Sequence, residues 1–359
     1  MSFSWMYSTE LETVVRNKII PGISDAISNV STTMKLLMNE GHIDAIPRNT
    51  PTAKAGFFGG GEYIEKIVRI AELEAVFSHR DYKPVPINPN RTKTAIKQGF
   101  GTYGATISTT RKEAASARSP EAKIKLLKDK HNEGYAILKE VIAQGIFNYD
   151  AMMVAGSLHE DGMNGLGQLA GRRYGGVNYG GINRSWMNLE SDATHTFWNS
   201  YLDSVVHPAA DLLDPTDTTD YIVYVIQNLV NGCTVGPYRP TNIVMPLALF
   251  SVYKEVLRRK QMITDSQTGN LGFEYLKYEG IPVTWDSYCP DYHIYALNLK
   301  PALGGNAPLG IMGRKDFWFD MTPWKQGIDT LERVRQIMVD INMWCDNPRL
   351  IGAAIRVGE

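Results

Sequence analysis

The amino-acid sequence predicts an α+β protein with more than one domain. Its 359 residues, 43% of them apolar and 21% charged, are typical of globular chains and supply enough apolar side chains for a sizeable core. One long amphipathic helix pattern, over 119–145, stands beside several stretches with strand-like alternation. These patterns form neither a regular βαβ series nor an internal repeat, which favours α+β over α/β architecture.

The helix predicted over 119–145 is the element around which the rest is organised. Ser119 can cap free amides, Pro120 suits the first helical position, and Glu121 faces the positive end of the helix dipole. At about 1.5 Å per residue this helix would be roughly 40 Å long. Gly145 is expected to end it as a left-handed residue. The predicted buried stripe consists of Ile124, Leu127, His131, Tyr135, Leu138 and Ile142.

Residues 1–55 are interpreted as an N-terminal arm. Short helices are expected around 11–20 and 27–38, separated by Pro21 and Gly22. Such an arm is either a loosely packed terminus or a strap that reaches a neighbouring subunit, and the pattern slightly favours the first. The start shows no basic-then-apolar signal pattern, and no apolar run is long enough to cross a bilayer, so neither secretion nor membrane insertion is expected.

A long two-stranded excursion is predicted within 56–115. Its outgoing arm spans 63–77, its proline-rich tip 84–89 and its return arm 100–110. The outgoing arm also fits a helix, whereas Tyr103, Ala105 and Ile107 alternate cleanly in the return arm. An insertion of this length suits a lid or a segment that packs on a partner.

Charge is unevenly distributed along a chain whose net charge is only −1. Residues 80–130 hold twelve basic and four acidic residues, and 181–232 hold seven acidic and one basic residue. They are either two solvated faces or complementary surfaces through which copies of the chain pack. The candidate interface residues are Arg80, Lys83, Arg91, Lys93 and Lys97 on the basic side and Asp211, Asp214, Asp217 and Asp220 on the acidic side.

The remaining elements alternate between short helices and strands. Helices are predicted over 221–229 and 247–260. Strands are predicted over 242–246, 273–277, 283–286 and 293–297, and paired strands are predicted in the tail over 328–357.

No motif for catalysis, metal binding or a cofactor is found. The HEDGM run at 159–163 lacks the second histidine of a zinc helix, and the glycines of 165–171 do not have dinucleotide-loop spacing. Asp214, Asp217 and Asp220 lack the glycine of a calcium loop and are interpreted as a solvated turn, and His131 as a core histidine. The cysteines form no paired motif: Cys233, Cys289 and Cys345. An enzyme that holds a phosphate ligand in the glycine-rich loop 162–181 is kept as an alternative.

The order of these parts resembles the major capsid proteins of tailed bacteriophages, which have the Hong Kong ninety-seven fold. The resemblance begins with the glycines at 59–61, the excursion and the capped helix, and extends to the C-terminus. It is also carried by YGGINRS at 179–185 with Trp186, NIVMP at 242–246, YEGIPV at 278–283 with Asp286, IYALN at 294–298, and NPRLIG at 347–352. Each motif is weak alone, and their common order makes the match specific.

The resemblance implies four parts. They are an N-terminal arm (1–55), an extended loop (56–115), a peripheral domain (116–216 and 321–359, with the spine helix 119–145) and an axial domain (217–320). It also implies self-assembly as hexamers and pentamers into an icosahedral shell around double-stranded DNA, which the shell would contact without sequence preference.

Further partners implied by the resemblance are a separate scaffolding protein, a portal protein and a decoration protein, with no membrane and no cofactor. The expected location is the virion, after assembly in the host cytoplasm. Some family members crosslink through a loop lysine, but no motif here assigns that role to Lys83, Lys93 or Lys97. The alternative within the same fold is an encapsulin-like nanocompartment shell.

Overall fold

The computed structural model describes part of the chain, and every structural statement below concerns that part. The described residues are 31–39, 57–58, 63–69, 93–116, 119–147, 162–163, 165–169, 173–174, 177–178, 184–186, 189–191, 200–217, 219, 221–259, 276–299, 309–314, 320–326, 333–345 and 347–359. The helix expected around 11–20 and the tip at 84–89 lie outside these residues.

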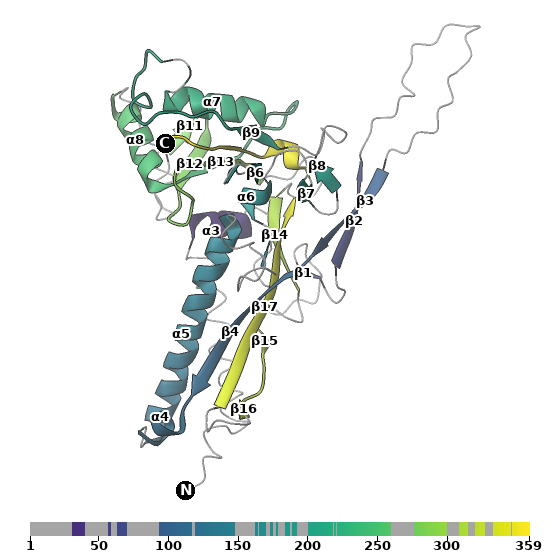
Figure 1. Ribbon diagram of the computed structural model, residues 1–359, viewed down its shortest axis with the longest axis vertical. Coiled ribbons are helices and arrows are strands. Elements are labelled where there is room, and N and C mark those ends of the chain that lie inside the picture. The colour runs from purple at the N-terminus through teal and green to yellow at the C-terminus, as the bar shows by residue number, and fades with distance from the viewer. Residues whose placement is uncertain are drawn as a thin grey trace, which may run out of the picture.

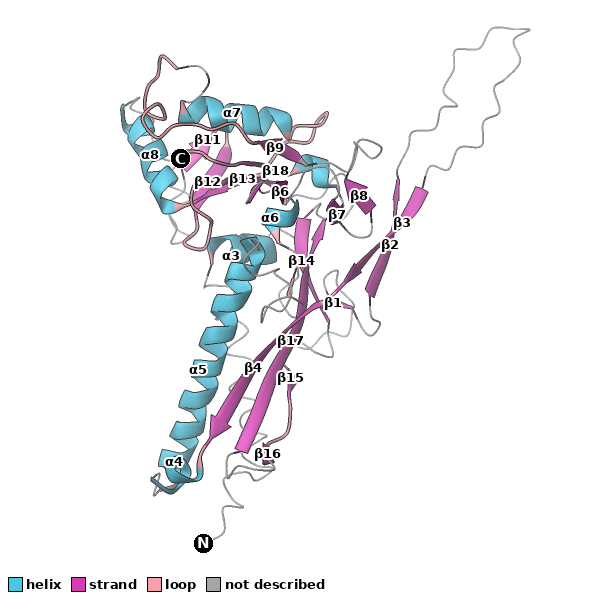
Figure 2. Cartoon of the chain, in the orientation of Figure 1, coloured by secondary structure: helices cyan, strands magenta, loops and turns pink. Residues whose placement is uncertain are grey.

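The described chain forms an elongated half and a compact half (Figure 1). The elongated half pairs one long helix with a narrow mixed sheet, and the compact half has two helices beside a second sheet (Figure 2). The long sheet contains β1 (Phe57–Phe58), β4 (Gly101–Thr109), β14 (Leu309–Arg314), β15 (Asp320–Met321), β16 (Lys325–Gln326) and β17 (Arg333–Cys345). The compact sheet contains β9 (Tyr201–Asp203), β10 (Asn242–Met245), β11 (Leu276–Tyr278), β12 (Ile281–Trp285), β13 (Ile294–Leu297) and β18 (Gly352–Ala354).

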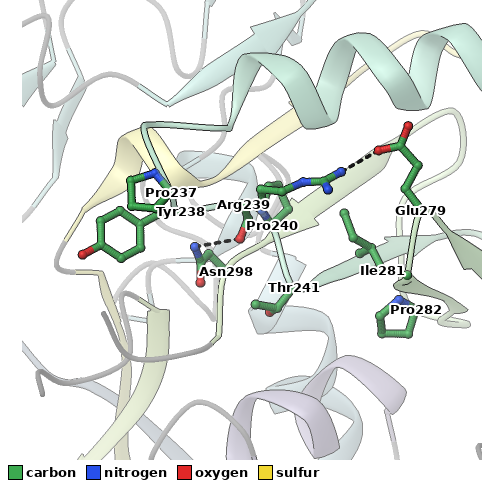
Figure 3. Close-up of a pocket in the computed structure, with 10 residues that line it drawn as sticks. Pro237, Tyr238, Arg239, Pro240, Thr241, Glu279, Ile281, Pro282 and Asn298 are labelled. Atoms are coloured by element: carbon green, nitrogen blue, oxygen red, sulfur yellow. Dashed lines mark hydrogen bonds and ion pairs between the residues drawn. The ribbon is translucent and has the colours of Figure 1, made fainter. Parts of the chain in front are cut away.

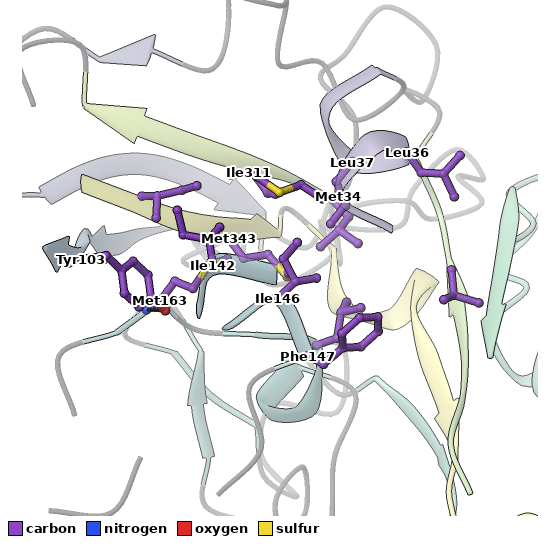
Figure 4. Close-up of a cluster of buried hydrophobic side chains, with 14 of the residues drawn as sticks. Met34, Leu36, Leu37, Tyr103, Ile142, Ile146, Phe147, Met163, Ile311 and Met343 are labelled. Atoms are coloured by element: carbon purple, nitrogen blue, oxygen red, sulfur yellow. Dashed lines mark hydrogen bonds between the residues drawn. The ribbon is translucent and has the colours of Figure 1, made fainter. Parts of the chain in front are cut away.

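The long helix α5 (Pro120–Phe147) confirms the helix predicted over 119–145. Ser119 Oγ accepts the Ala122 N–H at 3.1 Å, as expected of a capping residue. The predicted stripe is buried at Leu127, His131, Tyr135, Leu138 and Ile142. It packs on β4 and β17 through residues such as Tyr103 and Ile337, and Figure 4 shows the end of this core nearest the compact half. Burial of that apolar stripe, rather than helix propensity, is the main stabilisation of so long a helix.

Gly145 does not end the helix, so that prediction is wrong. Helix α5 continues through it to Phe147, and Gly145 is not among the described glycines with positive φ. A Cβ atom on Gly145 would lie 2.6 Å from the Tyr103 hydroxyl oxygen. The glycine therefore allows the helix to approach β4 closely, which is a packing role and not a capping role.

The excursion is a hairpin, but its return arm was misplaced. β2 (Tyr63–Arg69) pairs antiparallel with β3 (Lys93–Gly99), so the outgoing arm is a strand and not a helix over these residues. The predicted return arm, now β4, pairs instead with β17 from Gly101↔Ile341 to Thr109↔Arg333. The physical reason is burial: Tyr103 and Ile107 need a hydrophobic partner, which α5 supplies and a projecting hairpin does not.

The compact sheet confirms most of the short elements predicted between 221 and 297. Its order is β11-β12-β10-β13-β18-β9, with β10 and β12 parallel. α7 (Ile222–Gly232) and α8 (Leu247–Arg259) bury apolar faces in the second core. The tail strands are not paired with each other as predicted, because β17 belongs to the long sheet and β18 to the compact sheet. β18 pairs with β13 on one side and with β9 on the other, so a strand lies beside both of its edges.

The helix predicted over 27–38 is present as α3 (Thr32–Asn39), but it is not loosely packed. Met34 and Leu37 are almost fully buried and join the core beside Phe147 and Ile311 (Figure 4). The start of α3 is held by a distant side chain: Asp286, after β12, accepts the Thr33 N–H at 2.8 Å and the Ser31 hydroxyl. This part of the N-terminal segment is therefore core of its own subunit, because its apolar face is buried there.

Shorter elements complete the described chain. They are α4 (Arg111–Ser116), α6 (Leu166–Leu169), the pair β5 (Arg173–Tyr174) and β6 (Val177–Asn178), the pair β7 (Arg184–Trp186) and β8 (Leu189–Ser191), and the 3-10 turn η7 (Pro348–Leu350). None of the described helices has the length and apolar character needed to span a bilayer.

Candidate subunit interface

Two of the five basic candidates lie on the described part of the hairpin. Lys93 and Lys97 both lie on β3, and because side chains alternate along a strand, positions four apart share one face of the ribbon. The register places Lys93 opposite Arg69 and Lys97 opposite Glu65. The other three basic candidates, Arg80, Lys83 and Arg91, lie outside the described residues.

The described acidic candidates lie in the turns that lead into α7. Asp211 and Asp214 are linked through the backbone, since the Asp214 N–H donates to the Asp211 carbonyl oxygen at 2.9 Å. Asp214 Oδ1 accepts the Thr216 N–H at 2.9 Å and its hydroxyl at 2.7 Å, and these bonds hold the pKa of Asp214 below its usual value. Asp217 Oδ1 likewise accepts the Thr219 N–H at 2.6 Å, and Asp220 lies outside the described residues.

These carboxylates therefore stabilise turns, as side chains of aspartate commonly do. No group of three potential metal ligands is found among the residues that the structure describes. The turn lies beside α7 in the compact half, whereas the hairpin projects from the elongated half (Figure 1). One subunit thus does not bring the described basic and acidic candidates together, and their pairing between subunits stays a prediction.

The compact half also carries an open pocket of about 440 Å³ (Figure 3). Prolines and Ile281 supply much of its wall, and its charged groups are already paired: Arg239 Nη2 lies 2.6 Å from Glu279 Oε2. Asn298 Nδ2 donates to the Arg239 carbonyl oxygen at 3.0 Å. The lining includes neither histidine nor cysteine and a single acid, so it holds no nucleophile–base pair of the usual kinds. The alternative phosphate loop, 162–181, is described only in short pieces.

His131 is a core residue, as the sequence indicates. Its Nδ1 lies 2.6 Å from the Leu127 carbonyl oxygen, while its Nε2 has no hydrogen-bond partner in the described structure. Burial lowers the pKa of His131; the hydrogen bond to Leu127 opposes this in part, and the nearby Arg335 guanidinium adds a smaller lowering effect. The imidazole is therefore held neutral inside the protein.

We expect acid to destabilise the fold through His131. The unfolded chain gains a proton as the pH falls below about 6.5, whereas folded His131 stays neutral until its lower pKa is reached. Stability is therefore lost between these two values, with a slope of at most about 1.4 kcal/mol per pH unit. Chemical unfolding at pH 5 to 8 should show a shallower pH dependence for His131→Leu than for the parent protein. An equal dependence would contradict the assignment.

Sequence reasoning did not find several buried or partly buried polar residues that the structure brings together. Asp286 appeared only within a motif, and its contact with α3 spans more than 250 residues. Arg314, Asp340 and Asn342 form a polar group at the base of the hairpin. Asp340 and Asn342 fit the ordinary alternation of β17, so nothing in the sequence indicated that they are buried.

Neither the protein-family models nor the curated proteins contain a match to the sequence. Solved structures do match. The capsid of cyanophage A-1(L) is similar over 84% of this chain and 90% of its own, with a TM-score of 0.57 and 12% sequence identity. The capsid protein of a native GTA particle is similar over 87% of this chain and 97% of its own, with a TM-score of 0.51 and 10% identity.

The chain has the Hong Kong ninety-seven fold of phage capsid proteins. This confirms the fold class that the order of the sequence motifs predicted. The empty GTA particle gives the same result, with a TM-score of 0.50 and 10% identity over 84% of this chain and 87% of that one. The hairpin is a two-stranded sheet of its own, and the acidic turn lies between β9 of the compact sheet and α7.

Proposed function

We propose that this chain is a major capsid protein, which assembles as hexamers and pentamers into the icosahedral head of a tailed bacteriophage around double-stranded DNA. The observation that carries the proposal is the hairpin β2–β3, found in a chain with this fold. The two strands pair with each other and with no other described strand. An isolated two-stranded hairpin is marginally stable in water, so it gains most by packing on another subunit.

The same proposal assigns roles to the other parts of the chain. The hairpin is the extended loop, α5 with the long sheet is the peripheral domain, and the compact sheet with α7 and α8 is the axial domain. Two strands of the compact sheet come from outside 217–320, namely β9 and β18, so we place both in the axial domain. The role is structural and non-enzymatic, and the proposed partners are other copies of the chain, a separate scaffolding protein, a portal protein and a decoration protein. The proposed location is the virion.

Electron microscopy of the negatively stained protein tests this function. The protein is expressed alone and then together with the products of the neighbouring genes, which would include a scaffold. Closed shells or hexameric and pentameric rings are expected. A uniform 40.1 kDa particle under both conditions would contradict the proposal. Shells that enclose a cargo enzyme instead of DNA would favour the nanocompartment alternative.

Charge reversal on the hairpin is expected to slow assembly. Lys93→Glu and Lys97→Glu remove basic charge from one face of β3, and lost steering of this kind lowers association rates by about tenfold or more. Light scattering at low and high salt would measure the rate, because added salt screens such an effect. Normal shells formed at the parent rate by the double variant would rule out charge matching.

The single variants separate steering from damage to the hairpin. Lys93→Glu places a carboxylate opposite Arg69, which favours the hairpin, whereas Lys97→Glu places one opposite Glu65, which costs up to about 1 kcal/mol. If charge steers the encounter of subunits, both variants should assemble slowly. If Lys97→Glu assembles slowly and Lys93→Glu assembles at the parent rate, the cause is a weakened hairpin. Circular dichroism of the unassembled protein should show the parent fold for Lys93→Glu.

A further inference from the structure

Both legs of the hairpin join the long sheet at the same place. On the outgoing side, β1 pairs with β14 at Phe57↔Gly313 and Phe58↔Arg314. On the returning side, Phe100 is the single residue between the end of β3 and the start of β4. β17 lies between the two attachments, because Ile341 is opposite Gly313 on one side and Gly101 on the other. The direction of the hairpin is therefore decided at this stretch of β17.

A row of polar contacts crosses all three strands at this position. Arg314 Nη1 on β14 lies 3.1 Å from Asp340 Oδ2 on β17, and the Thr102 hydroxyl on β4 donates to Asp340 Oδ1 at 2.8 Å. Both carboxylate oxygens are thus engaged, each by a different neighbouring strand. Asp340 is only 5% exposed and Arg314 is partly buried, so these contacts are largely shielded from water. Polar contacts with this geometry hold β14 and β4 in a fixed relation across β17.

Side chains from β17 and β14 contact the junction at Gly99 and Phe100. Asn342 Nδ2 donates to the carbonyl oxygen of Gly99, the last residue of β3, at 2.7 Å. The other end of the Asn342 amide accepts the Met343 N–H at 2.8 Å, which fixes its orientation. The Arg314 guanidinium carbon lies 5.2 Å from the centre of the Phe100 ring, within the range of a cation–π contact. Phe100 is thus contacted by the same arginine that binds Asp340.

The position of these polar residues is unusual for β17. Ile337, Val339 and Ile341 face the core against α5 and are almost fully buried, as the alternation of a strand requires. Asp340 and Asn342 alternate with them on the opposite face, yet they too are buried. A buried ion pair is seldom more stabilising than apolar residues of the same size, but it specifies geometry when both partners are fixed. Here it lies where the hairpin departs.

We propose that Arg314, Asp340 and Asn342 form a hinge clamp, a set of positioning residues that fixes the direction in which the hairpin leaves the long sheet. Phe100 is the pivot of this hinge clamp. A second copy of the chain then meets the hairpin within a narrow range of angles, which limits the curvatures that the shell can adopt. This last step rests on the proposed function, whereas the effect on the hairpin itself does not.

Distance measurements between two spin labels test the hinge clamp in the unassembled, full-length protein. One label is attached at Thr94→Cys on β3 and the other at Asn132→Cys, an exposed position of α5. The native cysteines are buried and are poor targets for the label. The parent protein should give a single narrow distance peak. Asp340→Asn keeps the shape of the side chain but removes its charge, and Phe100→Leu removes the ring under Arg314. In each variant the single narrow peak should be replaced by a broader distribution of distances.

A matched control removes an ion pair elsewhere. Glu113→Gln breaks the partly exposed ion pair between Glu113 of α4 and Lys130 of α5, 3.1 Å apart, and should leave the peak narrow. Unchanged peaks in both hinge-clamp variants would overturn the proposal. Shells of uniform size from a variant with broadened distances would also overturn it, because the angle would then not matter to the neighbour. A parent protein that forms no shells would instead contradict the proposed function, and the label distances would still decide the hinge clamp.

Discussion

Replacing Asp286 with alanine is expected to destabilise the subunit by about 3–5 kcal/mol. This carboxylate accepts the Thr33 N–H at 2.8 Å, the Tyr288 N–H at 2.9 Å and the Ser31 hydroxyl. Asp286 is only 2% exposed, so water does not replace it easily when it is removed. Each buried donor left without a partner costs about 1–3 kcal/mol, and one of them lies in the first turn of α3.

Urea unfolding of the unassembled subunit would measure this loss. Asp291→Ala is the matched control, because Asp291 is exposed and lies five residues further along the same connection. It should change the free energy of unfolding by less than about 0.5 kcal/mol. Hydrogen exchange of Asp286→Ala should also show selective loss of protection in α3, because the Thr33 N–H in its first turn loses its acceptor. A loss of stability below about 1 kcal/mol would show that α3 does not depend on this side chain.

The elements that sequence predicted well are those determined by their own residues. The stripe of α5 repeats every three or four residues, and it is buried as predicted because only one face of that helix can meet the sheet. The strands β10 and β13 and the helices α7 and α8 were found in the same way. In each case the hydrophobic period and a nearby proline, glycine or polar residue were sufficient.

The failures concern partners that are distant in sequence. The alternation of Tyr103 and Ile107 correctly indicated a strand, but it could not show that its neighbour is β17, more than 200 residues away, instead of the outgoing arm of the hairpin. Gly145 was interpreted by the local rule for helix ends, whereas glycine is needed there because a side chain would collide with the Tyr103 hydroxyl. The docking of α3 was missed because Asp286, which accepts the Thr33 N–H, follows β12 and lies more than 250 residues away in the sequence.

The candidate interface was predicted less completely than the fold. Charge composition located a basic and an acidic region, but only the strand register shows that Lys97 is opposite Glu65. Slow assembly of Lys97→Glu could therefore come from a weakened hairpin and not only from lost charge attraction between subunits. Asp214 and Asp217 also stabilise the local backbone, since each accepts a hydrogen bond in its own turn. Net charge does not reveal such contacts, because it contains no geometry.

Gly101→Ala is the second substitution for which we expect a large loss of stability, about 1–3 kcal/mol or more. A Cβ atom at Gly101 would lie 2.5 Å from both the carbonyl carbon of Gly162 and the nitrogen of Met163. These are backbone atoms, and the Met163 N–H donates to the Tyr103 hydroxyl at 3.0 Å, so the segment cannot move away without breaking that bond. The strain must therefore be absorbed at the base of the hairpin.

Gly99→Ala is the matched control, two residues earlier on the other side of Phe100. A Cβ atom there would meet no atom within 4 Å, and Gly99 is not among the described glycines with positive φ. We expect a change within about 0.5 kcal/mol, or a small gain from reduced freedom of the unfolded chain. The pair also separates two explanations for glycine at this junction. If flexibility of the pivot were the reason, both substitutions would cost similar amounts; if close backbone approach is the reason, urea unfolding will show a loss for Gly101→Ala alone.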